Sequence, residues 1–144
     1  MTHFMWFVIR LLLLGLWVGA MAGFAFLFAP AAFAHIGPTP AFAATIAASL
    51  RLLTRVGEWC AIAAAAITAF AGLERPRTAA VIVALLAVAV VLSLVVTNVI
   101  IPQMETTPLQ TPAYDALHHR SSSLYSGVLL AGLVSFVLAA RARR

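Results

Sequence analysis

Four long apolar segments dominate the pattern of hydrophobic and polar positions along the chain. They cover about residues 5–28, 54–73, 78–101 and 121–140, and each is close to the length that crosses roughly 30 Å of hydrocarbon as an α-helix. The apolar positions do not alternate, and a backbone in lipid must satisfy its own hydrogen bonds, so strands are not expected. The pattern predicts an all-α, integral membrane four-helix bundle forming a single transmembrane domain over residues 1–144.

The composition agrees with a membrane protein. Hydrophobic residues make up 64% of the chain and charged residues only 9%, and the mean hydropathy is +1.07. These values lie far outside the usage of soluble globular domains. Because four spans use more than half of the 144 residues, any function is expected within the membrane or at its edges.

The first apolar segment has a second interpretation as a signal peptide. Arg10 would then belong to its charged region, and cleavage would follow Ala34 in a small-residue site. The apolar run is longer than the roughly 7–15 residues of a signal peptide core, which favours a retained span. A mature chain beginning at His35 would contradict the four-span prediction.

Arginine positions indicate the orientation, because cytoplasmic loops of membrane proteins carry an excess of basic residues. If the N-terminus is cytoplasmic, that side receives Arg10, Arg75, Arg77, Arg141, Arg143 and Arg144. The opposite side receives Arg51, Arg55 and Arg120. The basic side chains are all arginine and the chain is rich in alanine, a composition typical of high-GC bacteria. We therefore expect a multi-pass protein of the bacterial inner membrane with both termini in the cytoplasm.

The stretch before the second span differs from the other connections. Residues 41–55 are amphipathic, and Thr39 followed by Pro40 is a favourable N-cap and first-turn pair. A helix from Pro40 to Leu73 would be about 50 Å long, which exceeds the hydrocarbon thickness. This long extension is expected to project beyond the outer face, to lie in the interface or to bend near Gly57.

The connections also differ in length. Residues 74–77 form a tight turn, so the second and third helices are expected to be antiparallel neighbours. The outer connections, at residues 34–40 and 102–115, contain several prolines and are predicted to be longer.

Three glycines repeat at every fourth position of the first helix. Gly15, Gly19 and Gly23 therefore lie in one stripe, which lets another helix approach the backbone closely. This glycine zipper predicts helix packing, either within the bundle or between subunits.

Ionisable residues within spans are the best functional indicators, because a charge in hydrocarbon is costly unless it is paired or hydrated. The spacing of Arg55 and Glu58 predicts an ion pair on one helix face. Other polar groups fall at the same outer level on the third and fourth helices. The resulting candidate polar or ligand site consists of Arg55, Glu58, Asn98, His118 and Ser121. It would suit an anion, a metal ion or a polar headgroup, and the alternative is a simple interfacial ion pair.

Histidine offers a weaker candidate for a metal or haem site, since neutral imidazole is the commonest nitrogen ligand. His118 and His119 are adjacent, so in a helix their side chains point about 100° apart and cannot easily share one ion. Cys60 is the only cysteine, which excludes a multi-thiolate site. No catalytic motif is present, and the serines at 121–123 have no glycine-rich elbow. We therefore expect neither an enzyme nor a resident cofactor, with haem or metal as the alternative.

Several of these residues resemble a known pattern. Trp17 and Gly19, followed by Ala29, Pro30 and Phe33, resemble the first-helix motif of a bacterial family of four-helix membrane proteins, domain of unknown function 4149. Later motifs of the same family are similar to the residues Asn98, Pro102, Leu117, His118 and Ser121. That family is similar to eukaryotic transmembrane protein 205 and more distantly to copper-resistance D proteins. The resemblance implies a four-helix fold and a loose connection with metal or toxicant tolerance.

Three functional classes follow from these observations. The first is a non-enzymatic helical subunit or scaffold that packs against other membrane proteins or against a second copy. The second handles an ion, a metal or a small toxicant through the outer polar cluster. The third is a haem-binding redox protein. Lipid is the common partner of all three, and nucleic acid is not expected, because the arginines are scattered instead of clustered on one face.

Overall fold

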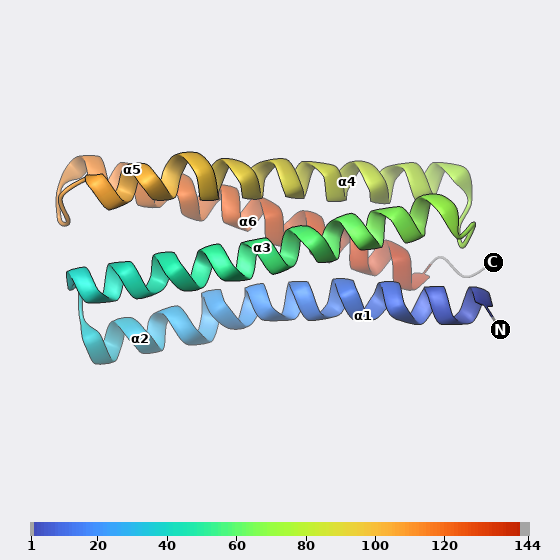
Figure 1. The fold of residues 1–144 in the computed structure, drawn as a ribbon, viewed down its shortest axis with the longest axis horizontal. Helices are drawn as coiled ribbons and strands as arrows, with labels where there is room; N and C mark the ends of the chain where they lie inside the picture. The colour runs from blue at the N-terminus through green and yellow to red at the C-terminus, as the bar shows by residue number, and fades with distance from the viewer. Residues whose placement is uncertain (1, 142–144) are drawn as a thin grey trace.

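Four helical rods form an antiparallel bundle in the computed structural model, which describes residues 2–141 (Figure 1). The first rod consists of α1 (Thr2–Gly23), the π-helix η1 (Phe24–Phe28) and α2 (Ala29–Ile36). The second is α3 (Pro40–Phe70). The third consists of α4 (Pro76–Val95), the π-helix η2 (Val96–Ile100) and α5 (Ile101–Thr106), and the fourth is α6 (Pro112–Arg141). The described residues contain no strand, so the prediction of an all-α four-helix bundle is confirmed.

All four rods are long and apolar enough to cross a membrane. Their candidate spans, the first of which is His3–Ile36, contain 34, 31, 31 and 30 residues, which corresponds to about 45–50 Å each at 1.5 Å per residue. The predicted excess length of the second helix is therefore shared by every rod. The α3 helix begins where the sequence predicted, because the Thr39 hydroxyl accepts a hydrogen bond from the Phe42 N–H at 3.1 Å. It continues through Gly57 without a break.

The outer connections are shorter than the sequence predicted. Only residues 37–39 separate the first two rods, and residues 107–111 separate the last two. Pro30 and Pro102 were expected to lie near or beyond the helix ends, but each follows a π-helix and continues the rod. Proline lacks an N–H and collides with the carbonyl four residues earlier, and the wider π turn makes room for its ring. Each rod therefore extends past its proline.

Both described ends of the chain lie at one end of the bundle (Figure 1). We call this the termini end, which also contains the turn at residues 71–75, and we call the opposite end, with the loops 37–39 and 107–111, the connection end. Large apolar side chains cover the outside of the bundle between these ends. Phe4, Leu12, Phe26, Leu27 and Phe70 are each at least 67% exposed. An apolar exterior of this kind is what contact with lipid requires.

The core of the bundle is built from small side chains on α3 facing larger ones on the other rods. Ala61 and Ala64 of α3 are fully buried, as are Leu14 of α1 and Ile82 of α4. The closest approach is at Gly57, where even a Cβ atom would collide with the Trp17 indole of α1. The Trp17 ring thus fills a slot that only glycine leaves open.

Candidate functional site

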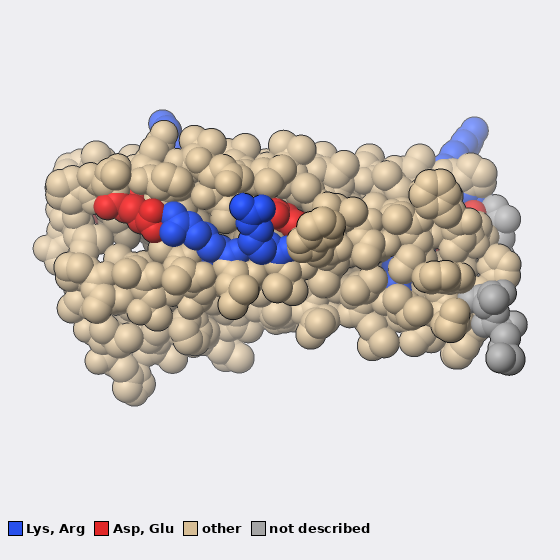
Figure 2. All heavy atoms as spheres, viewed as in Figure 1, with Lys and Arg blue, Asp and Glu red and all other residues tan. Residues whose placement is uncertain are grey.

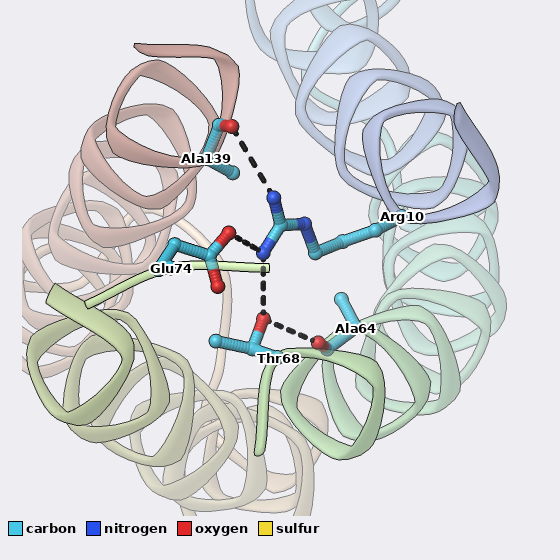
Figure 3. A network of polar contacts seen from close by, with 5 residues as sticks. All are labelled: Arg10, Ala64, Thr68, Glu74 and Ala139. Atoms are coloured by element: carbon cyan, nitrogen blue, oxygen red, sulfur yellow. Dashed lines mark hydrogen bonds and ion pairs between the residues drawn. The ribbon is translucent and has the colours of Figure 1, made fainter. Parts of the chain in front are cut away.

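A buried ion pair lies at the termini end of the bundle (Figure 3). The Arg10 side chain of α1 is completely buried and forms an ion pair with Glu74 of the α3–α4 turn. Arg10 Nη1 donates to Thr68 Oγ1 at 3.3 Å, and Nη2 donates to the Ala139 carbonyl at 3.2 Å. The Thr68 hydroxyl in turn donates to the Ala64 carbonyl at 2.8 Å. One guanidinium therefore joins α1, α3, the turn and α6.

From the sequence, Arg10 was assigned to orientation or to the charged region of a signal peptide and Glu74 to a turn, and this network was not predicted. The signal was available in the helical spacing. Arg10, Leu14, Trp17 and Met21 follow one another by four, three and four residues, so they share one face of α1. All four are buried, with at most 3% exposure. Arg10 therefore lies on the core face of its helix, where its charge requires a buried partner.

A second group of charges lies along the α3 side of the bundle. Arg55 Nη1 is 3.9 Å from Glu58 Oε2, as the spacing predicted, and the Glu58 side chain is 9% exposed. Arg51 does not join this pair. It crosses to α5, where its Nη2 lies 2.6 Å from Glu105 Oε2. In Figure 2, basic and acidic side chains form a short line across the visible face, and further basic side chains lie nearer the two ends of the bundle.

The remaining predicted residues divide between the surface and a pocket. Asn98 is exposed on η2, and its amide donates to the Leu94 carbonyl of its own helix at 2.9 Å. Ser121 is 9% exposed, and its hydroxyl donates to the His118 carbonyl at 2.9 Å. The pocket lining includes His118 and Ser121 but not Arg55, Glu58 or Asn98. Thus, only two of the five predicted residues share this cavity.

This pocket, with a volume of about 560 Å³, lies at the connection end between the first rod, α3, α5 and α6. Its apolar walls come from the first two rods, and they include Phe24, Ala29, Pro30, Phe42, Ile46 and Ala47. Most of its polar lining comes from α6, namely Tyr114, His118, Ser121, Ser122, Tyr125 and Ser126, and Glu105 and Thr107 of the third rod and its loop add to it. The α6 residues recur at helical spacing, so they form one stripe along α6 facing the apolar walls. The pocket was not predicted, because its apolar side depends on how the rods diverge.

Two serine hydroxyl groups on this stripe have partners within α6. Ser121 and Ser126 donate to carbonyls three and four residues earlier, at 2.9 and 2.8 Å. The Tyr125 hydroxyl is buried beside the Thr54 side chain of α3. It is therefore enclosed between α6 and α3.

The histidines are placed less favourably for a metal ion. The ring centroids of His118 and His119 are 6.3 Å apart, and both residues are exposed. Within residues 2–141, no three His, Cys, Asp or Glu side chains come close enough together to hold a metal ion. Cys60 is a free, buried thiol. Ligation of haem or metal by His118 or His119 remains a prediction.

The glycine stripe of α1 contacts the bundle at one of its three positions. A Cβ atom at Gly15 would lie 3.4 Å from the Phe136 ring of α6. Cβ atoms at Gly19 and Gly23 would meet nothing within 4 Å. Closer approaches within the bundle occur at Gly57, Gly127 and Gly132.

Comparison with models of known families, with curated proteins and with solved structures finds no match to this chain. The resemblance of its motifs to a known family therefore remains a prediction, and the function is inferred from the geometry of the pocket.

Proposed function

We propose that the protein is a non-enzymatic, multi-pass protein of the bacterial inner membrane that holds a small amphipathic molecule in the pocket at its connection end. The observation that carries this proposal is the pairing of apolar walls from the first rod and α3 with a polar stripe on α6. Its volume of about 560 Å³ lies in the usual range for small-molecule sites, which also combine apolar walls with a few polar groups.

The position of the pocket along the bundle supports an amphipathic ligand. On α6, residues 112–123 are largely polar, and the predominantly apolar part of the helix begins at Leu124. The pocket lining extends across this boundary, from Tyr114 to Ser126. A molecule with an apolar body and a polar group concentrates at the corresponding level of a bilayer, the boundary between the polar headgroups and the hydrocarbon. With both termini in the cytoplasm, as the arginine distribution favours, this level is the outer face of the membrane.

The two sides of the pocket would bind the two parts of such a ligand. Its polar group would lie against the α6 stripe, where the hydroxyl oxygens of Ser121 and Ser126 retain lone pairs. The apolar body of the same ligand would contact Phe24, Phe42 and Ile46. The proposal therefore concerns reversible binding and requires no bond to be made or broken.

Filling the pocket tests this proposal. In nanodiscs, the neutral fluorophore N-phenyl-1-naphthylamine should bind the protein saturably above the background of empty nanodiscs. Ala47 lines the pocket, whereas its neighbour Ala48 is exposed on the same helix outside the lining. Ala47→Phe should weaken binding about tenfold or more by occupying the apolar volume, and Ala48→Phe should leave it unchanged. Equal binding by both variants would contradict the proposal.

A second candidate function, as a helical subunit or scaffold, is favoured by one specific observation. Leu12, Leu16, Gly19 and Gly23 share a face of the first rod by their spacing. Both leucines are 67% exposed, and the two glycines are open to a further helix. Small residues beside larger ridges are typical of membrane helix interfaces. A partner subunit or a second copy of this chain would pack there, on a face away from the pocket lining.

A further inference from the structure

We infer that the pocket selects amphiphiles that carry a positive charge, such as lipophilic ammonium or phosphonium ions. This inference rests on the proposed function and specifies its ligand class. Three independent features of the lining carry it: its only formally charged residue is acidic, three of its hydroxyl groups present only oxygen lone pairs, and four aromatic residues line it.

The charged residue is Glu105 of α5, and the lining contains no arginine. Arg51 holds one carboxylate oxygen, Oε2, at 2.6 Å. The other oxygen, Oε1, has no hydrogen-bond partner among the described residues. The two side chains are 41% and 44% exposed, so Arg51 can move into solvent at small cost. A cationic group in the pocket would then have a carboxylate available to it.

Three hydroxyl groups of the lining favour a cation for a different reason. Thr107, Ser121 and Ser126 each donate their hydrogen to a backbone carbonyl earlier in the same segment, at 2.7, 2.9 and 2.8 Å. Because each hydroxyl carries a single hydrogen, these oxygens retain only lone pairs for a ligand. Such groups accept hydrogen bonds and interact favourably with positive charge. They offer little to an anion, which needs donors.

Aromatic rings supply the third feature. The lining contains Phe24, Phe42, Tyr114 and Tyr125. The face of an aromatic ring carries partial negative charge, and it attracts ammonium-type cations without a counter-ion. Together with one carboxylate and three acceptor oxygens, these rings favour a positive charge in the pocket. An organic cation with apolar substituents satisfies both the rings and the apolar walls.

Two ions of the same shape and opposite charge test the inference. Tetraphenylphosphonium and tetraphenylborate each place four phenyl groups around one central atom. They are titrated against bound N-phenyl-1-naphthylamine in nanodiscs of neutral lipid, with empty nanodiscs used to correct for partitioning. Tetraphenylphosphonium should displace the probe at about tenfold lower free concentration than tetraphenylborate, a difference of about 1.4 kcal/mol.

Charge variants assign this preference to the pocket. Glu105→Gln should weaken tetraphenylphosphonium binding about fivefold and change the affinity for the neutral probe much less, because the main loss is the interaction with charge. Arg51→Gln should strengthen tetraphenylphosphonium binding, because the Glu105 carboxylate no longer has a competing partner. Asp115→Asn is the matched control, since Asp115 is an exposed carboxylate on α6 outside the lining. It should change neither affinity. Thermal unfolding of each variant verifies that it is folded.

The possible outcomes separate the inference from the function on which it rests. Equal displacement by both ions, stronger displacement by tetraphenylborate, or weaker cation binding by Arg51→Gln would each overturn the cation preference. Binding of the neutral probe would survive any of these results. Failure of the wild-type protein to bind the neutral probe or either ion would instead overturn the proposed function.

Discussion

Arg10 is the residue whose role changes most between sequence and structure. In the sequence it interrupts an apolar run and counts toward orientation, but in the folded chain its side chain is fully buried and paired with Glu74. Its spacing from Leu14 predicts that it faces the core. The identity of its partner could not be predicted, because Glu74 is 64 residues away in the sequence. Only the folded turn brings it to α1.

Removing this arginine should destabilise the protein. Arg10→Gln leaves the Glu74 carboxylate buried beside a neutral side chain, and breaking a buried pair from one side typically costs about 3–5 kcal/mol. Arg75→Gln, which removes an exposed arginine at the same end, should change stability by less than about 0.5 kcal/mol. Thermal unfolding of the two variants in the same detergent measures both changes in stability. Adding Glu74→Gln to Arg10→Gln should recover part of the loss, and equal melting temperatures for the two single variants would contradict this account of the pair.

At the scale of helices, proline and glycine positions are visible in the sequence, but their consequences depend on neighbours. Pro102 predicts an interruption of the helix. The wider turn of the π-helix before it accommodates the proline ring, and α5 continues for a further turn. The regular stripe of Gly15, Gly19 and Gly23 predicts close packing, while the tightest contact is made by Gly57, which belongs to no stripe. Which glycine lies under a bulky side chain depends on the register between helices, and a single sequence does not determine that register.

Replacing glycine by alanine should change stability differently at the tightly packed Gly57 and at the open Gly19. Gly57→Ala forces its Cβ into the Trp17 indole, and overpacking of this kind typically costs about 1–3 kcal/mol. Gly19→Ala meets nothing within 4 Å and replaces glycine in a helix interior, so stability should be unchanged or slightly higher, by up to about 1 kcal/mol. Thermal unfolding of the two variants is the measurement. A Gly57→Ala protein as stable as Gly19→Ala would show that the Trp17 contact is not tight.

On the scale of the whole molecule, hydrophobic patterning predicted the four rods and the all-α bundle. The distribution of arginines predicts an orientation that the rods allow, because an even number of crossings places both termini at one end. The pocket could not be predicted. Its polar stripe on α6 is visible as a helical pattern, but its apolar walls come from the first rod and α3, and Arg51 is joined to Glu105 across 54 residues. Such pairings require knowledge of which helices are neighbours.

Site-directed labelling tests the central claim most directly, because it reports on the pocket and on its side of the membrane together. Cys60 is first replaced by alanine, and cysteine is then introduced either at Ser122 in the pocket lining or at Arg75 in the turn at the termini end. In intact cells, a membrane-impermeant maleimide should label Ser122→Cys but should label Arg75→Cys only after permeabilisation. In nanodiscs, saturating N-phenyl-1-naphthylamine should slow labelling of Ser122→Cys several-fold and leave Arg75→Cys unaffected. Labelling of Ser122→Cys only after permeabilisation, or at a rate that the ligand does not change, would contradict an outward-facing amphiphile pocket.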